Sequence, residues 1–179
     1  MKNETVLITG GAGFIGSHLA YSLRNDYRVI SLDNYSNGSE ENHIDGVKYI
    51  NADTTQCYQL ENYQPSIIFH FGEYARVEQS ITDIEKVIKS NVIGTSQVLE
   101  YWRKKRCKLI YAGSSTKFGD GGRSIQDTPY AWTKAKNTET IKAYSDWYNL
   151  PYAIVYFYNV YGEREVAEGP YATVVAKFL

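Results

Sequence analysis

Apolar residues in this chain gather in short runs, separated by longer segments with helical periodicity. The short runs have the length of buried strands and lie at residues 5–8, 28–32, 47–50, 66–70, 107–112 and 152–157. In the longer segments apolar side chains recur every three or four residues, which predicts helices over 14–25, about 83–105 and about 130–149. Strands and helices that alternate in this way predict an α/β fold with a doubly wound parallel sheet, a Rossmann fold.

Length and composition favour one domain of ordinary charge. The chain has 179 residues, and neither an internal repeat nor a Pro/Gly-rich linker divides it. Its formal net charge of −1 gives no sign of a nucleic-acid or membrane-surface binder. The one basic run, Arg103–Arg106, falls where a helix should end, and cations there complement the helix dipole. The first residues show neither a signal peptide nor a spanning segment, so we expect a cytoplasmic protein.

Cysteine and histidine residues give no sign of metal or redox chemistry. Cys57 and Cys107 lack the spacing of a metal or redox motif, and we expect them to be packing thiols. The three histidines are scattered over different predicted elements. We therefore expect no metal site.

The segment after the first predicted strand is rich in glycine. Residues 9–16 read TGGAGFIG and lie between a strand and a helix, as dinucleotide-binding turns do. Glycine lets the backbone approach a pyrophosphate closely, and the N-terminus of the following helix favours negative charge. We therefore predict that a dinucleotide binds to Gly10, Gly13, Phe14, Ile15 and Gly16.

The second predicted strand is followed by an acid that fits this interpretation. Asp33 lies about 20 residues beyond the glycines, the spacing at which a carboxylate reaches the hydroxyls of an adenosine ribose. Its charge would repel a 2′-phosphate and no arginine directly follows it, which favours NAD over NADP. We include the adjacent Asn34 among the cofactor contacts. The alternative is an acid that only ends a strand beside a loop.

Tyr130 and Lys134 form a YxxxK pair at the start of the last predicted helix. Positions i and i+4 share a helix face, so the Lys134 ammonium can lie near the Tyr130 phenol and favour its ionised form. An ionised phenol can act as a general base near neutral pH. Ser114 follows the end of the preceding predicted strand, which completes a candidate catalytic set of Ser114, Tyr130 and Lys134.

Together these motifs resemble the extended short-chain dehydrogenase/reductase family, and more narrowly its NAD-dependent nucleotide-sugar epimerase/dehydratase branch. The resemblance covers essentially the whole chain and rests on TGGAGFIG at 9–16, Asp33, Asn91–Thr95, Ser114, YAWTK at 130–134 and Tyr158–Gly162. It implies that Tyr130 is the catalytic base, that Lys134 holds the nicotinamide ribose, and that Ser114 hydrogen-bonds the reacting sugar oxygen.

The resemblance also implies contacts at positions that carry no strong local signal. Further cofactor positions are Asp53, Thr54, Phe71, Gly72, Tyr130 and Asn91, the last of which matches the family's structural asparagine. Substrate positions are Ser114, Ser115 and Asn159. On local sequence alone, Thr54 could instead start a helix and Asn159 could instead cap a turn. Glu73 and Arg76 follow the fourth predicted strand, where they either contact substrate or lie in a solvated loop.

The residues after Ser114 bear on which family reaction is expected. Dehydratases of this family follow the serine or threonine with an Asp-Glu pair that removes water, whereas this chain has Ser115 and Thr116. The resemblance therefore favours epimerisation, expected at C4 of a UDP-sugar: Tyr130 takes a hydroxyl proton, hydride passes to NAD, and the keto sugar takes it back on its other face. A dehydratase or reductase of the same family, or an NAD-binding module without turnover, is the alternative.

Relatives in this family run on well past the point where this chain stops. We expect residues 1–179 to form the NAD-binding domain and to end at the start of the substrate-binding region, with most of the C-terminal substrate lobe absent. The chain is then either a fragment or a reduced protein that needs another chain to complete its site. The resemblance also implies a homodimer that pairs through the helices near 83–105 and 130–149.

Overall fold

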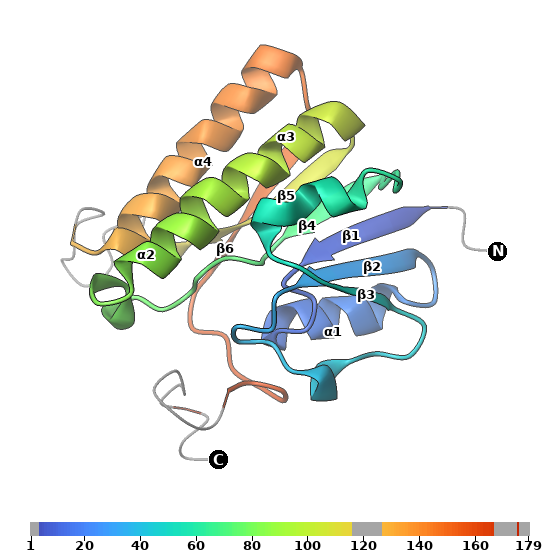
Figure 1. The fold of residues 1–179 in the computed structure, drawn as a ribbon, viewed down its shortest axis with the longest axis horizontal. Helices are drawn as coiled ribbons and strands as arrows, with labels where there is room; N and C mark the ends of the chain where they lie inside the picture. The colour runs from blue at the N-terminus through green and yellow to red at the C-terminus, as the bar shows by residue number, and fades with distance from the viewer. Residues whose placement is uncertain (1–3, 116–126, 167–174, 176–179) are drawn as a thin grey trace.

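The computed structural model describes residues 4–115, 127–166 and 175. One fully parallel sheet has the strand order β3-β2-β1-β4-β5-β6 (Figure 1). The strands are β1 (Thr5–Thr9), β2 (Arg28–Asp33), β3 (Lys48–Asn51), β4 (Ile67–His70), β5 (Lys108–Ser114) and β6 (Tyr152–Phe157). This order is the doubly wound arrangement, and it confirms the Rossmann fold that the sequence predicts.

Helices cover both faces of the sheet. On one side lies α1 (Phe14–Leu23), and on the other α3 (Thr95–Lys105) and α4 (Pro129–Tyr148) lie side by side (Figure 1). The helix predicted over 83–105 is a continuous run of α2 (Ile84–Val87), a π-helical segment η4 (Ile88–Gly94) and α3. The structure also contains short 3₁₀ helices, which span too few residues to show a clear apolar periodicity in the sequence. They are η1 (Glu40–Asn42), η2 (Thr54–Leu60) and η3 (Glu78–Ile81).

The core has two parts because successive strand residues face opposite layers. Val6 and Ile8 pack with Ala20 of α1, whereas Leu7 belongs to the larger cluster under α3 and α4. The expected packing thiols, Cys57 and Cys107, are buried in that larger cluster. Burial raises the pKa of the Cys57 thiol to about 12 and that of Cys107 to about 11, so both stay protonated at neutral pH.

Local sequence sets the ends of the helices. At the start of α4, the Thr128 hydroxyl accepts the N–H of Ala131 at 3.1 Å, and Pro129 occupies the first helical position. Asn149 ends α4 in a left-handed conformation with φ 50°. The predicted basic helix end is also present, because Arg103, Lys104 and Lys105 lie in the last turn of α3. Within the described ranges, no helix is long and apolar enough to cross a membrane.

Candidate active site

A cavity of about 490 Å³ opens along the carboxyl edge of the sheet. In open sheets of this order, ligands bind where the strand order reverses, which here is between β1 and β4. The volume of the cavity lies within the roughly 300–1,000 Å³ range of small-molecule sites. Most predicted site residues line it: Gly10, Gly13, Phe14, Ile15, Gly16, Asp33, Asn34, Thr54, Phe71, Gly72, Ser114, Ser115, Tyr130, Lys134 and Asn159.

The glycine turn is packed backbone against backbone. Gly10 has φ +76°, and a Cβ built on it would stand 2.9 Å from Cα and N of Gly72, which follows β4. A Cβ on Gly16 would stand only 2.0 Å from the Gly10 carbonyl oxygen. Larger side chains at these positions would push the turn away from α1 and from the loop after β4.

The neighbouring N-terminus of α1 and Asp33 offer polar groups to the same cavity. No side-chain hydrogen bond caps α1 at Gly13, and its first turn contains no acid, so its positive end is not neutralised there. The Asp33 carboxylate accepts the N–H of Ala12 at 2.9 Å and that of Tyr35 at 2.9 Å, one on each oxygen. Each oxygen keeps a second lone pair that can accept a hydroxyl.

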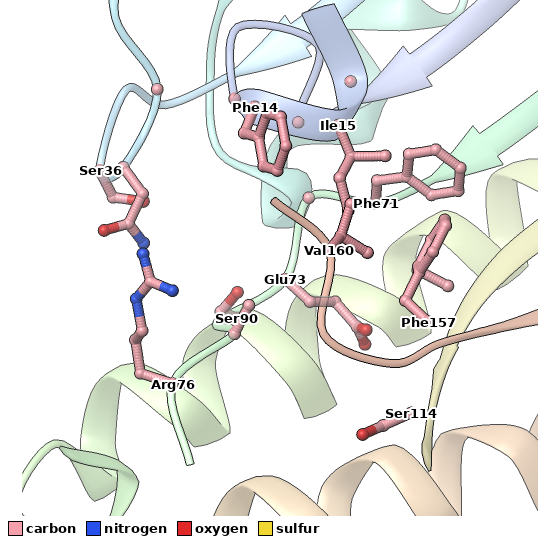
Figure 2. A pocket seen from close by; sticks show the side chains of 18 of the residues that line it. Phe14, Ile15, Ser36, Phe71, Glu73, Arg76, Ser90, Ser114, Phe157 and Val160 are labelled. Atoms are coloured by element: carbon pink, nitrogen blue, oxygen red, sulfur yellow. The ribbon is translucent and has the colours of Figure 1, made fainter. Parts of the chain in front are cut away.

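The candidate catalytic set lies at the other end of the cavity. Ser114 is the last residue of β5 and is 6% exposed, while Tyr130 and Lys134 come from the start of α4. Phe71 and Phe157, which line the same region, meet edge to face with ring centroids 5.6 Å apart (Figure 2). Asn159 lies at a bend after β6 and is exposed. The cavity thus joins a dinucleotide-type turn to a serine, a phenol and an ammonium.

Two predicted cofactor residues lie outside the cavity lining. Asp53 caps η2 by accepting the N–H of Thr55 at 3.0 Å, and it also accepts the Asn34 side-chain amide at 3.0 Å. Asn91 is fully buried in η4, where it accepts the backbone N–H of Tyr74 at 2.7 Å and donates to the Thr133 hydroxyl at 3.2 Å. Thr54 begins η2, as its local sequence suggested, and it also lines the cavity; its contact with a cofactor stays a prediction.

Comparison with known proteins places this geometry in a family. A profile of the NAD dependent epimerase/dehydratase family matches residues 6–179. The chain belongs to this family. The family resemblance that the sequence motifs carry is thereby confirmed, and the family's cofactor is NAD.

Individual family members differ in the reactions that their names describe. A UDP-N-acetyl-alpha-D-glucosaminuronate decarboxylase of Bacillus cytotoxicus is 30% identical over 97% of this chain and 59% of its own. The structure of UDP-glucose 4-epimerase from Thermotoga maritima with UDP-glucose superposes with a TM-score of 0.89, at 29% identity over 97% of this chain and 61% of that one. The Thermus thermophilus UDP-glucose 4-epimerase in complex with NAD gives 0.81 at 29% identity, over 93% and 58%. The chain spans about 60% of the length of these relatives.

The residues of the cavity fit the family's cofactor. The glycines leave no side chain between the turn and α1, and the uncapped helix end offers backbone N–H groups to a pyrophosphate. Asp33 is held by two backbone amides with lone pairs to spare for ribose hydroxyls. These groups would hold the adenosine and diphosphate of NAD, and Lys134 would hold the nicotinamide ribose.

The sequence placed Glu73 either at the substrate or in a solvated loop, and did not predict its partner. The solvated-loop interpretation of Glu73 is wrong, because its side chain is 2% exposed and its carboxylate forms an ion pair with Lys134. Lys134 also donates to the Ala112 carbonyl, so these two bonds use two of the ammonium's three N–H donors. Glu73 and Lys134 are 61 positions apart in the sequence, so no local pattern could indicate that they pair.

Arg76 also lines this cavity. Its side chain reaches from the loop after β4 toward the loop that carries Ser36 (Figure 2). This position is consistent with the interpretation that Arg76 contacts a bound ligand.

Behind Glu73 lies a hydrogen-bond chain in which a neutral histidine fits. The Thr95 hydroxyl donates to Glu73 at 2.7 Å, because a carboxylate can only accept, and it therefore accepts from Nε2–H of His70 at 2.9 Å. Nδ1 of His70 then accepts from the Thr9 hydroxyl at 2.8 Å, which in turn accepts the Gly72 N–H at 3.0 Å. Burial lowers the pKa of His70 to about 4, consistent with this neutral form.

We expect Gly16→Ala to weaken NAD binding at least tenfold and to destabilise the fold by about 1–3 kcal/mol, because the new methyl group would overlap the Gly10 carbonyl oxygen. Calorimetric titration with NAD and thermal unfolding measure the two effects. Ser22→Ala, at an exposed position of the same helix, is the matched control. Unchanged affinity and melting temperature in Gly16→Ala would contradict this packing.

We expect folding stability to decrease as the pH falls from about 6.5 toward 4. The pKa of His70 is lower in the folded protein than in the unfolded chain, so the unfolded chain binds more protons in that window. Lowering the pH therefore stabilises the unfolded chain relative to the folded protein. Denaturant unfolding from about pH 7 to 5 should show this slope, and His70→Gln should flatten it. His43→Gln, at an exposed position, should keep the wild-type slope; equal slopes in both variants would argue against the buried neutral histidine.

Proposed function

We propose that this chain is the NAD-binding and catalytic part of a nucleotide-sugar epimerase that acts at C4 of a UDP-sugar. The observation that carries the proposal is the one cavity that is lined both by the glycine turn with Asp33 and by Ser114, Tyr130 and Lys134. Bound NAD supplies a reversible hydride acceptor. The activity, the substrate and the partners of the whole protein are part of this proposal, since the chain spans about 60% of its relatives.

In the proposed reaction, Tyr130 accepts the proton of the C4 hydroxyl while the C4 hydrogen leaves as hydride, so that the alcohol is oxidised to a ketone. Ser114 donates a hydrogen bond to the oxygen that becomes the carbonyl. After the keto sugar turns over, hydride returns to its other face and Tyr130 gives the proton back. Every cycle therefore regenerates the starting cofactor and needs no external oxidant or reductant.

Epimerisation is favoured over dehydration by the acids available at the catalytic end. Removal of water from the sugar requires an acid or base in addition to Tyr130. Ser115 stands at the first position where family dehydratases carry acids, and the second position, Thr116, lies outside the described residues. Glu73, the acid beside Lys134, is engaged by the ammonium and three further donors. Such a carboxylate is poorly suited to take another proton.

The proposed assembly is a homodimer that pairs through the helical run 84–105 and α4. These helices carry large apolar side chains that are at least one-third exposed: Ile84, Ile88, Val92, Ile93, Trp132, Trp147 and Tyr148. Exposed apolar surface of this extent on neighbouring helices is typical of a protein contact. A second copy of the chain would cover it with the same surface.

Tyr130→Phe tests the catalytic proposal. We expect it to retain NAD and to lose turnover by a factor of about 10²–10⁴, because the proton acceptor is removed while the cofactor contacts remain. Native mass spectrometry detects bound NAD, and incubation with UDP-glucose or UDP-galactose detects C4 epimers. Tyr144→Phe is the control, since this tyrosine lies on the same helix and bonds Glu100.

Each wild-type outcome separates the candidate functions. Retained NAD with epimer formation supports the epimerase. Retained NAD without turnover favours a cofactor-binding part or module. If the purified protein holds no NAD, the cofactor assignment for this chain is overturned.

We expect a solution mass of twice the 20.4 kDa chain by light scattering. Ile88→Glu should weaken the dimer at least tenfold, because it places a charge among the exposed apolar side chains of 84–105 and α4. Tyr58→Glu, on η2 and 67% exposed, should leave the mass unchanged. A monomeric wild-type mass would overturn the proposed assembly.

A further inference from the structure

Glu73 and Lys134 form a buried ion pair at the end of the cavity that the proposed function uses for chemistry. Their side chains are 2% and 6% exposed, yet both residues line the cavity. Figure 2 shows the Glu73 side chain in the space between Ser90 and Ser114, under the segment that carries Val160. The pair therefore places one negative and one positive charge directly behind the cavity wall.

The carboxylate of Glu73 is held by three further donors, from α3, α4 and β5. One of its oxygens accepts from the Thr95 hydroxyl at 2.7 Å, the Asn137 amide at 2.7 Å and the Tyr111 hydroxyl at 3.2 Å. The other oxygen accepts from Lys134. A carboxylate with this many donors has one orientation, and so has the ammonium bound to it.

Other titratable groups face the pair from neighbouring elements. His70 on β4 lies 4.0 Å from Glu73 and is neutral above about pH 4. Burial, and then Glu73, raise the pKa of Tyr111 on β5, which therefore stays protonated. Tyr130 on α4 and Arg76 in the loop after β4 line the same cavity, while Asn91, Thr95 and Asn137 are neutral. Glu73 is thus the counter-ion of Lys134.

We propose that Glu73 is a positioning residue that fixes the Lys134 ammonium and offsets its charge at the nicotinamide, so that the cavity favours the cationic oxidised nicotinamide over the neutral reduced form. This inference rests on the proposed function for the identity of the cofactor. An ammonium without its counter-ion would repel the oxidised ring and leave the reduced ring unaffected. Retention of the oxidised form is what a reaction that starts from bound NAD requires.

The first experiment needs no cofactor. Burial lowers the pKa of Lys134, but the charge and hydrogen bond of Glu73, together with Tyr111 and Tyr130, raise it by more, so the amine should be protonated and unreactive in the wild type. In Glu73→Gln we expect acetylation of Lys134 by acetic anhydride to become at least tenfold faster at about pH 8. Peptide mapping by mass spectrometry measures the rate at this lysine. An unchanged rate would overturn the proposal.

The second experiment measures cofactor preference. We expect Glu73→Gln to weaken the binding of NAD at least tenfold more than that of NADH, by titration of each form at a pH low enough that Lys134 of the variant is still protonated, as its slow acetylation shows. If acetylation rises but the ratio of the two dissociation constants does not move, Glu73 does not select the oxidised cofactor and that claim is overturned. If the wild type binds neither form, the proposed function fails, while the acetylation rates still decide whether Glu73 holds Lys134.

Control variants separate charge from structure. Tyr111→Phe removes one donor to Glu73 but keeps the ion pair, so Lys134 should stay unreactive and the cofactor preference should stay unchanged. Glu100→Gln removes an exposed carboxylate that binds Arg103 and Tyr144, and it should match the wild type in both experiments.

A second pair of variants keeps the proposal testable if Glu73→Gln does not fold. Lys134→Met leaves a buried carboxylate without its counter-ion, which raises its pKa in the folded protein. Stability should then fall as the pH rises from about 5 to 8, and the double variant Glu73→Gln/Lys134→Met should not show this fall. The same pH dependence in both variants would overturn the role of Glu73 as counter-ion.

Discussion

Glu73 and Lys134 carry opposite charges in a region where either charge would be costly without the other. Burial of either charge without the other costs several kcal/mol, and their attraction offsets this only when further hydrogen bonds satisfy both groups. Those bonds come from α3, β5 and α4. The ion pair therefore requires that these elements be docked on the sheet, and it makes the wall of the cavity depend on the packed core.

The parallel sheet makes this convergence possible. β1 and β4 are neighbours although their paired residues Thr9 and His70 are 61 positions apart, and the strand order reverses between them. The Gly10 turn and Gly72 then meet without side chains between them. Residues that follow β1, β2, β4, β5 and β6 consequently line one cavity. A cofactor and a substrate that bind along this edge would meet at Ser114, Tyr130 and Lys134.

The patterns that predicted the fold are local ones. Apolar runs and helical periodicity predicted the strands and the bounds of α1 and α4 to within two residues, because each pattern lies inside one element. The glycine turn, Asp33 and the YxxxK pair were recognisable for the same reason. The π-helical segment around Asn91 was not predicted, and there the Asn91 side chain bonds Tyr74 and Thr133 from other parts of the chain.

The sequence by itself determined the parallel α/β fold, the strand ends that carry site residues and the family to which they point. Only the tertiary structure decided which charges and hydrogen bonds meet there. It turned Glu73 from a loop residue into the partner of Lys134, and it gave Asp53 and Asn91 neighbours outside the cavity lining. The physical reason is that secondary structure follows from neighbours along the chain, whereas the pairing of buried polar groups depends on which distant elements pack together.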